Sequence, residues 1–216
     1  MAEPGNSSAV TDDPLAPAAG GADQRAAPRF SLLIRAAKLV ADCGEYLCIV
    51  RDISATGTRL KLFHDLPPQP CLFLELANGE RFALERVWHE DGHAGFRFSA
   101  MIDVDAFVAE AAPFRRRPVR LRMQHAGLVF TGGQIAAATL HDVSQQGARI
   151  ESRLHMAVGQ MCRLEVEGMP PRVAKVRWRR GDGYGLVFEQ TFRLDELAAT
   201  VWAVQSGTLA RQARCA

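Results

Sequence analysis

The sequence DISATG at residues 52–57 returns as DVSQQG at residues 142–147, 90 positions further along the chain. The same offset relates six further pairs of identical residues, namely Arg59 and Arg149, Leu74 and Leu164, Glu75 and Glu165, Trp88 and Trp178, Gly95 and Gly185, and Phe98 and Phe188. One register that runs through so many positions indicates an internal repeat. We therefore predict two copies of one small domain, at residues 25–102 and 115–192.

Segments with the length and pattern of β-strands fill the first copy. Apolar or alternating runs lie at residues 46–50, 58–63, 71–76, 82–88 and 95–98, and a further run at residues 30–40 precedes them. Strand-length runs at this density are typical of an all-β barrel or sandwich. The run at 30–40 also fits one face of a helix, so its conformation stays open at this point.

Three segments lie outside the two copies. Residues 1–24 are rich in Ala, Gly, Pro and Ser, which predicts a disordered tail. Residues 103–114 begin with an acidic turn and contain Pro113, which predicts a short linker helix. Residues 193–216 carry apolar side chains at helical spacing, which predicts a C-terminal helix. We expect this helix to pack on its own barrel; a binding face for a protein partner is the alternative.

The composition is that of a soluble globular protein, with 48% hydrophobic and 23% charged residues among 216. The net charge is +2, and the acidic residues of the tail leave the rest of the chain mildly basic. A dedicated nucleic-acid binder is expected to be more strongly basic. The first residues lack a positively charged start followed by an apolar block, so we expect no secretory signal, and we expect no membrane span because no apolar run suits one. Five cysteines without a CxxC pair predict free thiols, and we expect a cytoplasmic protein.

Each copy opens with two arginines four residues apart, Arg25 with Arg29 and Arg116 with Arg120. The hexamer comes 23 residues after the second arginine in the first copy and 22 residues after it in the second. A guanidinium group matches phosphate oxygens and the Hoogsteen edge of guanine. The Asp and Ser of the hexamer can accept N–H groups, and its Gly is predicted to allow a positive φ in a tight turn. A guanine nucleotide needs this combination of donors and acceptors.

Both copies resemble PilZ domains, the bacterial receptor modules for cyclic di-GMP, over most of residues 25–192. The resemblance implies two tandem six-stranded antiparallel β-barrels, a C-terminal helix, and an Arg-rich segment that folds over a ligand held against the hexamer strand. The implied arginines contact phosphates and guanine, while Asp and Ser contact the bases. These roles would fall on Arg25, Arg29, Asp52, Ser54 and Gly57 in the first copy, and on Arg116, Arg120, Asp142, Ser144 and Gly147 in the second, with Arg115 and Arg117 beside them.

The second copy is the preferred site because it offers four arginines within residues 115–120. The same residues would join the two barrels, so a ligand could order the junction and change the interdomain geometry. A junction already rigid without ligand, locked by Phe107 and Phe114, is the alternative. The hexamer could also be an ordinary turn whose Asp and Ser bond to the local backbone.

Other chemistry finds little support in the sequence. The stretch 89–93 matches His-Glu-x-x-His, but Asp91-Gly92 between strand-like runs predicts a hairpin and no zinc site. Trp88 and Trp178 are interpreted as core or barrel-rim aromatics. No nucleophile is paired with a base, so we expect no enzyme and no cofactor. The leading hypothesis is a cyclic di-GMP receptor with a protein partner in motility, biofilm or envelope signalling; a non-binding scaffold that acts through protein partners is the alternative.

Overall fold

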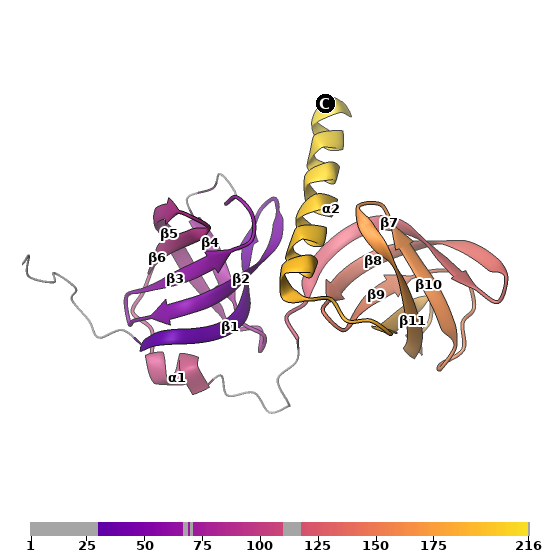
Figure 1. The fold of residues 1–216 in the computed structure, drawn as a ribbon, viewed down its shortest axis with the longest axis horizontal. Helices are drawn as coiled ribbons and strands as arrows, with labels where there is room; N and C mark the ends of the chain where they lie inside the picture. The colour runs from indigo at the N-terminus through magenta and orange to yellow at the C-terminus, as the bar shows by residue number, and fades with distance from the viewer. Residues whose placement is uncertain (1–29, 67–68, 70, 110–117, 216) are drawn as a thin grey trace, which may run out of the picture.

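Two closed six-stranded antiparallel barrels make up most of the protein, as the computed structural model shows for residues 30–66, 69, 71–109 and 118–215 (Figure 1). The first barrel consists of β1 (Phe30–Ala41), β2 (Gly44–Ile53), β3 (Gly57–Leu62), β4 (Cys71–Glu75), β5 (Arg81–Glu90) and β6 (His93–Phe98). The second consists of β7 (Leu121–Thr131), β8 (Gln134–Ser144), β9 (Gly147–Glu151), β10 (Met161–Val166), β11 (Met169–Arg180) and β12 (Gly183–Phe188). The predicted all-β fold is therefore confirmed, and the ambiguous run at 30–40 is a strand.

The repeat seen in the sequence extends to the connections of the strands. The first barrel closes in the order β1-β2-β3-β6-β5-β4, and the second closes in the same order. Ile102 N–H donates to the Ala55 carbonyl, and Phe192 N–H donates to the Gln145 carbonyl, again with the offset of 90. The two copies thus share their turns as well as their strands.

Alternating strand residues build a separate core in each barrel. In β3, Leu60 and Leu62 are buried while Arg59 and Lys61 are exposed, as expected of a strand with one solvated face. The predicted hairpin at 89–93 is also present, because β5 ends at Glu90 and β6 begins at His93. Asp91 and Gly92 have φ values of 48° and 68°, which a two-residue turn between such strands requires.

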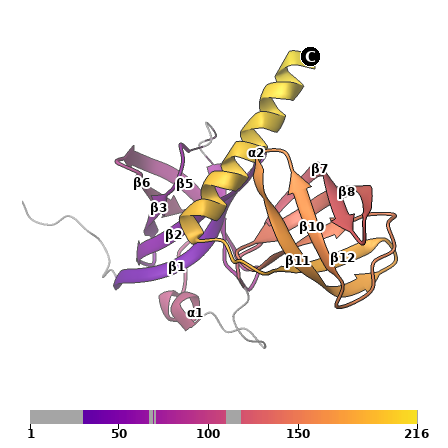
Figure 2. The ribbon, with the colours of Figure 1, turned by 45° about the vertical axis from the view of Figure 1, so that its right-hand side comes forward.

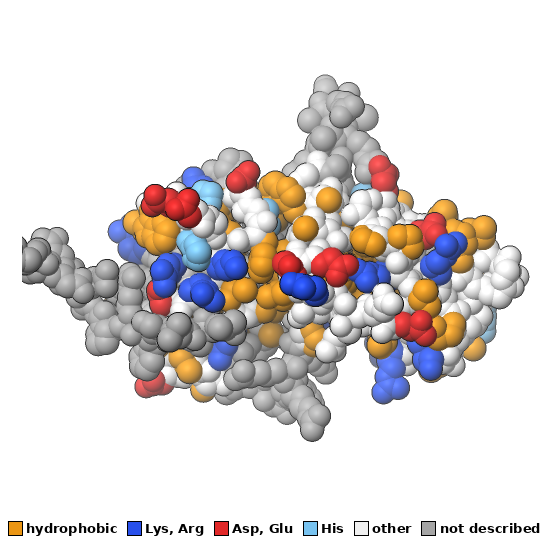
Figure 3. Space-filling view, viewed as in Figure 1, with side chains coloured by type: hydrophobic (Ala, Val, Ile, Leu, Met, Phe, Trp, Pro, Cys, Tyr) orange, Lys and Arg blue, Asp and Glu red, His pale blue; other side chains and the backbone are white. Residues whose placement is uncertain are grey.

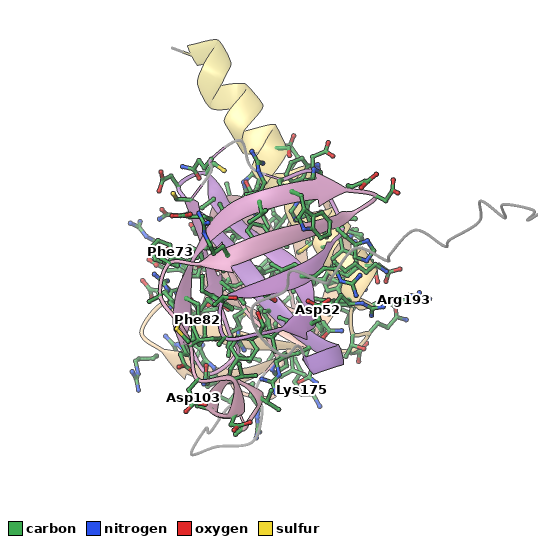
Figure 4. All side chains as sticks on the ribbon, turned by 90° about the vertical axis from the view of Figure 1, so that its left-hand side faces the viewer. Asp52, Phe73, Phe82, Asp103, Lys175 and Arg193 are labelled. Atoms are coloured by element: carbon green, nitrogen blue, oxygen red, sulfur yellow. The ribbon has the colours of Figure 1, made fainter. Side chains whose placement is uncertain are left out.

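A helix begins at the equivalent position after each barrel. The predicted linker helix is α1 (Val104–Ala109), and α2 (Leu194–Cys215) begins 90 positions later. Phe107 of α1 is buried and packs against Phe82, at the end of the first barrel where Figure 4 labels Phe82 and Asp103. Arg35 of β1 donates hydrogen bonds to the carbonyls of Phe107 and Val108. These carbonyls in the last turn of the short helix would otherwise need another donor. The helix α1 thus belongs to the first barrel.

The helix α2 lies between the two barrels (Figures 1 and 2). Leu197 and Val201 join the core of the second barrel, as the sequence predicted. The prediction is incomplete, however, because α2 also packs on the first barrel. Trp202 stacks on His64 at 4.8 Å between ring centres and packs against Tyr46. The apolar spacing of α2 could not reveal this second contact, because it does not say which surface each face of the helix meets.

No helix in the described part of the chain is long and apolar enough to cross a membrane. The face of the molecule in Figure 3 carries Lys, Arg, Asp and Glu side chains interspersed on both barrels. Four cysteines among the described residues are free thiols: Cys43, Cys48, Cys71 and Cys162.

Candidate ligand-binding site

One row of four residues crosses four adjacent strands at the same place in each barrel. In the second barrel, Asp142 lies opposite Arg149, Arg149 opposite Gly185, and Gly185 opposite Trp178. The first barrel repeats this row with Asp52, Arg59, Gly95 and Trp88. We call these two sets the Asp–Arg–Gly–Trp rows. Each row starts at the hexamer that revealed the repeat.

Strand irregularities set both ends of each row. A register shift directly precedes Asp142 in β8, and another precedes Trp178 in β11; the first barrel has both shifts at the equivalent places. Such bulges redirect the side chains beside them. The Trp178 indole lies so close to Gly185 that a Cβ there would be 2.0 Å from the indole Nε1. Gly185 therefore provides the space that the indole occupies.

Asp142 is held between two guanidinium groups. Arg120 Nη1 lies 2.5 Å from Asp142 Oδ1, and Arg149 Nε lies 3.0 Å from Asp142 Oδ2. The Asp142 side chain is 11% exposed, whereas both arginine side chains are about half exposed. A guanidinium has five N–H donors, so each arginine keeps further donors for an anionic ligand. The carboxylate thus fixes two cationic groups at the surface.

Two cavities meet at Arg149. The first has a volume of about 510 Å³ and lies at the junction of the barrels. Its charged lining has four basic and two acidic side chains, which are Lys38, Arg120, Arg122, Arg149, Glu75 and Asp142. The second has a volume of about 690 Å³, and its lining includes Trp178, Arg179 and Arg180. Volumes of this size are typical of small-molecule sites.

The Ser and Gly of each hexamer form the turn behind the row. Ser144 is buried and its Oγ donates to the Gly147 carbonyl at 3.1 Å, and Ser54 bonds to Gly57 in the same way. The predicted positive φ at Gly57 and Gly147 is wrong, since neither is among the residues with positive φ. Glycine is needed there for close packing, because a Cβ on Gly147 would lie 2.0 Å from the Leu186 carbonyl oxygen.

The structure brings together only some of the predicted site residues. In the second barrel it joins Arg120 to Asp142, with Ser144 and Gly147 in the adjacent turn. In the first barrel Asp52 forms an ion pair with Arg59 at 2.7 Å. The predicted arginines Arg25, Arg29, Arg115, Arg116 and Arg117 lie outside the described residues.

Sequence reasoning missed two residues that line the cavities. The sequence marks Arg149 only as part of the repeat, and it favours a core or rim position for Trp178. Trp178 is 43% exposed, so it presents much of its ring to solvent. The sequence signal that marks both residues is the offset of 90, which repeats the Arg and the Trp in the two copies. Exposed side chains of this kind are not needed to fill a core.

One protein-family model matches the part of the chain that contains the second barrel. Residues 114–201 match the family model described as PilZ domain. No curated protein matches the chain.

Three similar solved structures serve for comparison. The PlzA protein of Borreliella burgdorferi in complex with c-di-GMP is 9% identical, with 81% of this chain and 87% of that chain covered and a TM-score of 0.31. The inhibitor of motility MotI/DgrA of Bacillus subtilis is 12% identical, with 83% and 99% covered and a TM-score of 0.36. YcgR of Escherichia coli in complex with c-di-GMP is 13% identical, with 84% and 86% covered and a TM-score of 0.28.

Proposed function

We propose that this chain, whose residues 114–201 match the PilZ domain model, is a receptor for cyclic di-GMP. The ligand binds at the second barrel, against the row that begins at Asp142. The observation that carries this proposal is the pair of half-exposed arginines, Arg120 and Arg149, fixed on one buried carboxylate where two cavities meet.

The phosphates of the ligand bind the two arginines. Bonds between guanidinium groups and phosphates are charge-assisted and stronger than neutral hydrogen bonds. Asp142 holds both arginines in place, so little side-chain freedom remains to be lost on binding. The predicted arginines of residues 115–117 would close over the same phosphates.

The guanine bases occupy the remaining surface. Trp178 offers an exposed ring on which a base can stack, beside Arg149. Asp142 can accept guanine N–H groups that adenine does not present at the same position. The hydroxyl of Ser144 is engaged in the turn, so Ser144 supports the site by shaping the hexamer.

Ligand binding changes the geometry between the barrels in this proposal. The first cavity is lined from both barrels, by Lys38 and Glu75 on one side and by Arg120 and Arg122 on the other. A ligand that binds there favours one arrangement of the barrels by its differential contacts with that arrangement. Small-angle scattering with and without cyclic di-GMP tests this part, and identical profiles at saturation would contradict it.

The receptor has no catalytic activity of its own and acts in the cytoplasm, where free thiols such as those of the described cysteines persist. Isothermal titration of the whole chain with cyclic di-GMP tests the proposal, with cyclic di-AMP as the comparison ligand. We expect binding of cyclic di-GMP and much weaker binding of cyclic di-AMP. No heat of binding at any temperature tested would reject the receptor and favour a scaffold that acts through protein partners.

A further inference from the structure

A buried ion cluster of the first barrel contacts the main chain of the second barrel's ligand-binding arginine. Lys38 Nζ lies 2.7 Å from Glu45 Oε2, 2.9 Å from Glu75 Oε1 and 3.1 Å from the Arg120 carbonyl oxygen. The side chains of Lys38, Glu45 and Glu75 are less than one tenth exposed. An ammonium group has three N–H donors, so Lys38 finds an acceptor for each of them.

Glu45, which belongs to the same cluster, contacts the same segment two residues further along. Its Oε2 accepts the Arg122 backbone N–H at 2.7 Å. The main chain of Glu45 is itself fixed by α2: Gln205 Nε2 donates to the Glu45 carbonyl at 2.8 Å, and Glu45 N–H donates to Gln205 Oε1 at 3.1 Å. Lys38 and Glu45 of the first barrel therefore hold both ends of residues 120–122, and α2 fixes the main chain of Glu45.

The ion cluster orients residues 120–122 more than it stabilises the contact between the barrels. Burying charges carries a desolvation penalty, and apolar groups of similar size often give equal or greater stability. The junction already has apolar contacts, since Leu47 of β2 belongs to the core cluster of the second barrel. What apolar contacts cannot supply is a fixed donor for one carbonyl and a fixed acceptor for one N–H.

We propose that Lys38 and Glu45 are positioning residues of the ligand site, which hold the main chain of Arg120 so that its guanidinium meets Asp142 and the ligand phosphate. This inference rests on the proposed function and deepens it, because it makes the affinity of the second barrel depend on the first. Positioning before binding raises affinity by reducing the freedom lost on binding. Since coupling between sites is reciprocal, the bound ligand also favours the docked arrangement of the barrels.

A double-mutant cycle in the whole chain tests the proposal, with cyclic di-GMP affinity as the readout. Lys38→Met should weaken binding roughly tenfold in the wild-type background, which corresponds to about 1.4 kcal/mol. In the Arg120→Ala background, Lys38→Met should have little further effect, because the side chain that it positions is gone. An equal loss in both backgrounds would overturn the proposal, since a merely structural role would not depend on Arg120.

Arg81→Met is the matched control. Arg81 Nε lies 2.6 Å from Glu75 Oε2, so this variant also removes a cationic partner of Glu75, but no contact of Arg81 with residues 120–122 is found in the described part of the chain. We expect its affinity to stay within about twofold of the wild type, well below the tenfold of one charge-assisted bond. A loss as large as that of Lys38→Met would overturn the proposal.

A second variant covers the case in which Lys38→Met fails to fold. The triple variant Lys38→Met, Glu45→Gln, Glu75→Gln removes the charges together and leaves no buried carboxylate unpaired. It should fold and bind roughly tenfold more weakly than the wild type; wild-type affinity would overturn the inference. If the wild type itself does not bind cyclic di-GMP, the proposed function fails. If Arg120→Ala weakens binding but the Lys38 variants do not, the proposed function stands and the positioning role fails.

Discussion

The two barrels share the Asp–Arg–Gly–Trp row but differ in the helix that comes after the last strand. After the first barrel, α1 spans six residues, and Phe107 caps the barrel's own core. After the second, the equivalent helix α2 runs for 22 residues and reaches back to Tyr46 and His64 of the first barrel. One extended helix therefore turns a simple repeat into an asymmetric pair.

The surroundings of the two rows differ as well. Beside the second row, Glu151 lies opposite Gly183, two positions away from the pair Arg149 and Gly185. At the equivalent place in the first barrel, Lys61 lies opposite His93. In the second barrel Asp142 pairs with both Arg120 and Arg149, beside a cavity that both barrels line. The row itself is thus common to both barrels, and in the proposed function we expect the residues around it to decide which barrel binds the nucleotide.

The largest expected effect comes from Arg120, which pairs with Asp142 at the head of the second row. Arg120→Ala should weaken cyclic di-GMP binding roughly 10- to 100-fold, because a charge-assisted hydrogen bond contributes about 1.5 to 3 kcal/mol. Arg97→Ala, which removes an exposed pair with Glu85 in the first barrel, is the control and should bind like the wild type. Calorimetry measures both. Wild-type affinity in a folded Arg120→Ala protein would show that Arg120 is not a ligand residue.

Replacing the carboxylate at the head of each row compares the barrels directly. Asp142→Ala should lose most of the preference for cyclic di-GMP over cyclic di-AMP, while attraction for anions persists because Arg120 and Arg149 remain. Asp52→Ala should keep the preference. Competition titrations with the two dinucleotides give the ratio, and an unchanged ratio in Asp142→Ala would leave Asp142 with a structural role alone.

The tryptophans at the other end of the rows offer a smaller contrast. Trp178→Ala should weaken binding roughly tenfold, since stacking of a base on an aromatic side chain contributes about 1 to 3 kcal/mol. Trp88→Ala removes the equivalent ring from the first barrel and should have no effect on affinity. Equal losses from both variants would place the ligand on both barrels, and no loss from Trp178→Ala would exclude stacking there.

The smallest contrast concerns stability. Burial would raise the pKa of Glu75, but hydrogen bonds from Lys38 and Arg81 outweigh it and hold the pKa below its ordinary value of 4.5. A carboxyl group with a lowered pKa stabilises the fold above its unfolded-state pKa, and this contribution is lost as the pH falls through the folded-state pKa. The urea midpoint of the wild type should therefore fall more steeply below pH 4.5 than that of Glu75→Gln.

The equivalent residue of the second barrel serves as the control for Glu75. Glu165 forms a more exposed pair with Arg163 at 3.1 Å. Because exposed pairs contribute little to stability, Glu165→Gln should leave the urea midpoint at pH 7 almost unchanged, while Glu75→Gln should lower it. Parallel curves for the wild type and Glu75→Gln at all pH values would contradict the stabilising role of Glu75.

Sequence patterns predicted most of the fold because strand alternation and the repeat are local or periodic signals. The hexamer and the matched offset established the repeat, and the apolar runs located the strands. The acidic turn before Pro113 indicated the short helix, and Asp91-Gly92 indicated the hairpin. The reason for the glycine at position 147 was mistaken, because its neighbour, the Leu186 carbonyl, belongs to a strand that is distant in sequence.

The junction could not be predicted for the same physical reason. Lys38, Glu45 and Glu75 look like ordinary surface charges when each is read in its own strand. Their burial depends on the second barrel and on Gln205 of α2, which lies 160 residues from Glu45. Contacts between two barrels leave no periodic trace in either one, so only the structure reveals that the Arg120 main chain meets Lys38 of the first barrel while its guanidinium meets Asp142 of the second.

Hydrogen exchange with and without saturating cyclic di-GMP tests the central claim most directly, because it reports where on the chain the ligand binds. The account predicts added protection at residues 118–123, 142–149 and 178–185, and none at the equivalent residues 52–59 and 88–95 of the first barrel. Protection confined to the first barrel, or no change anywhere at saturation, would contradict the account.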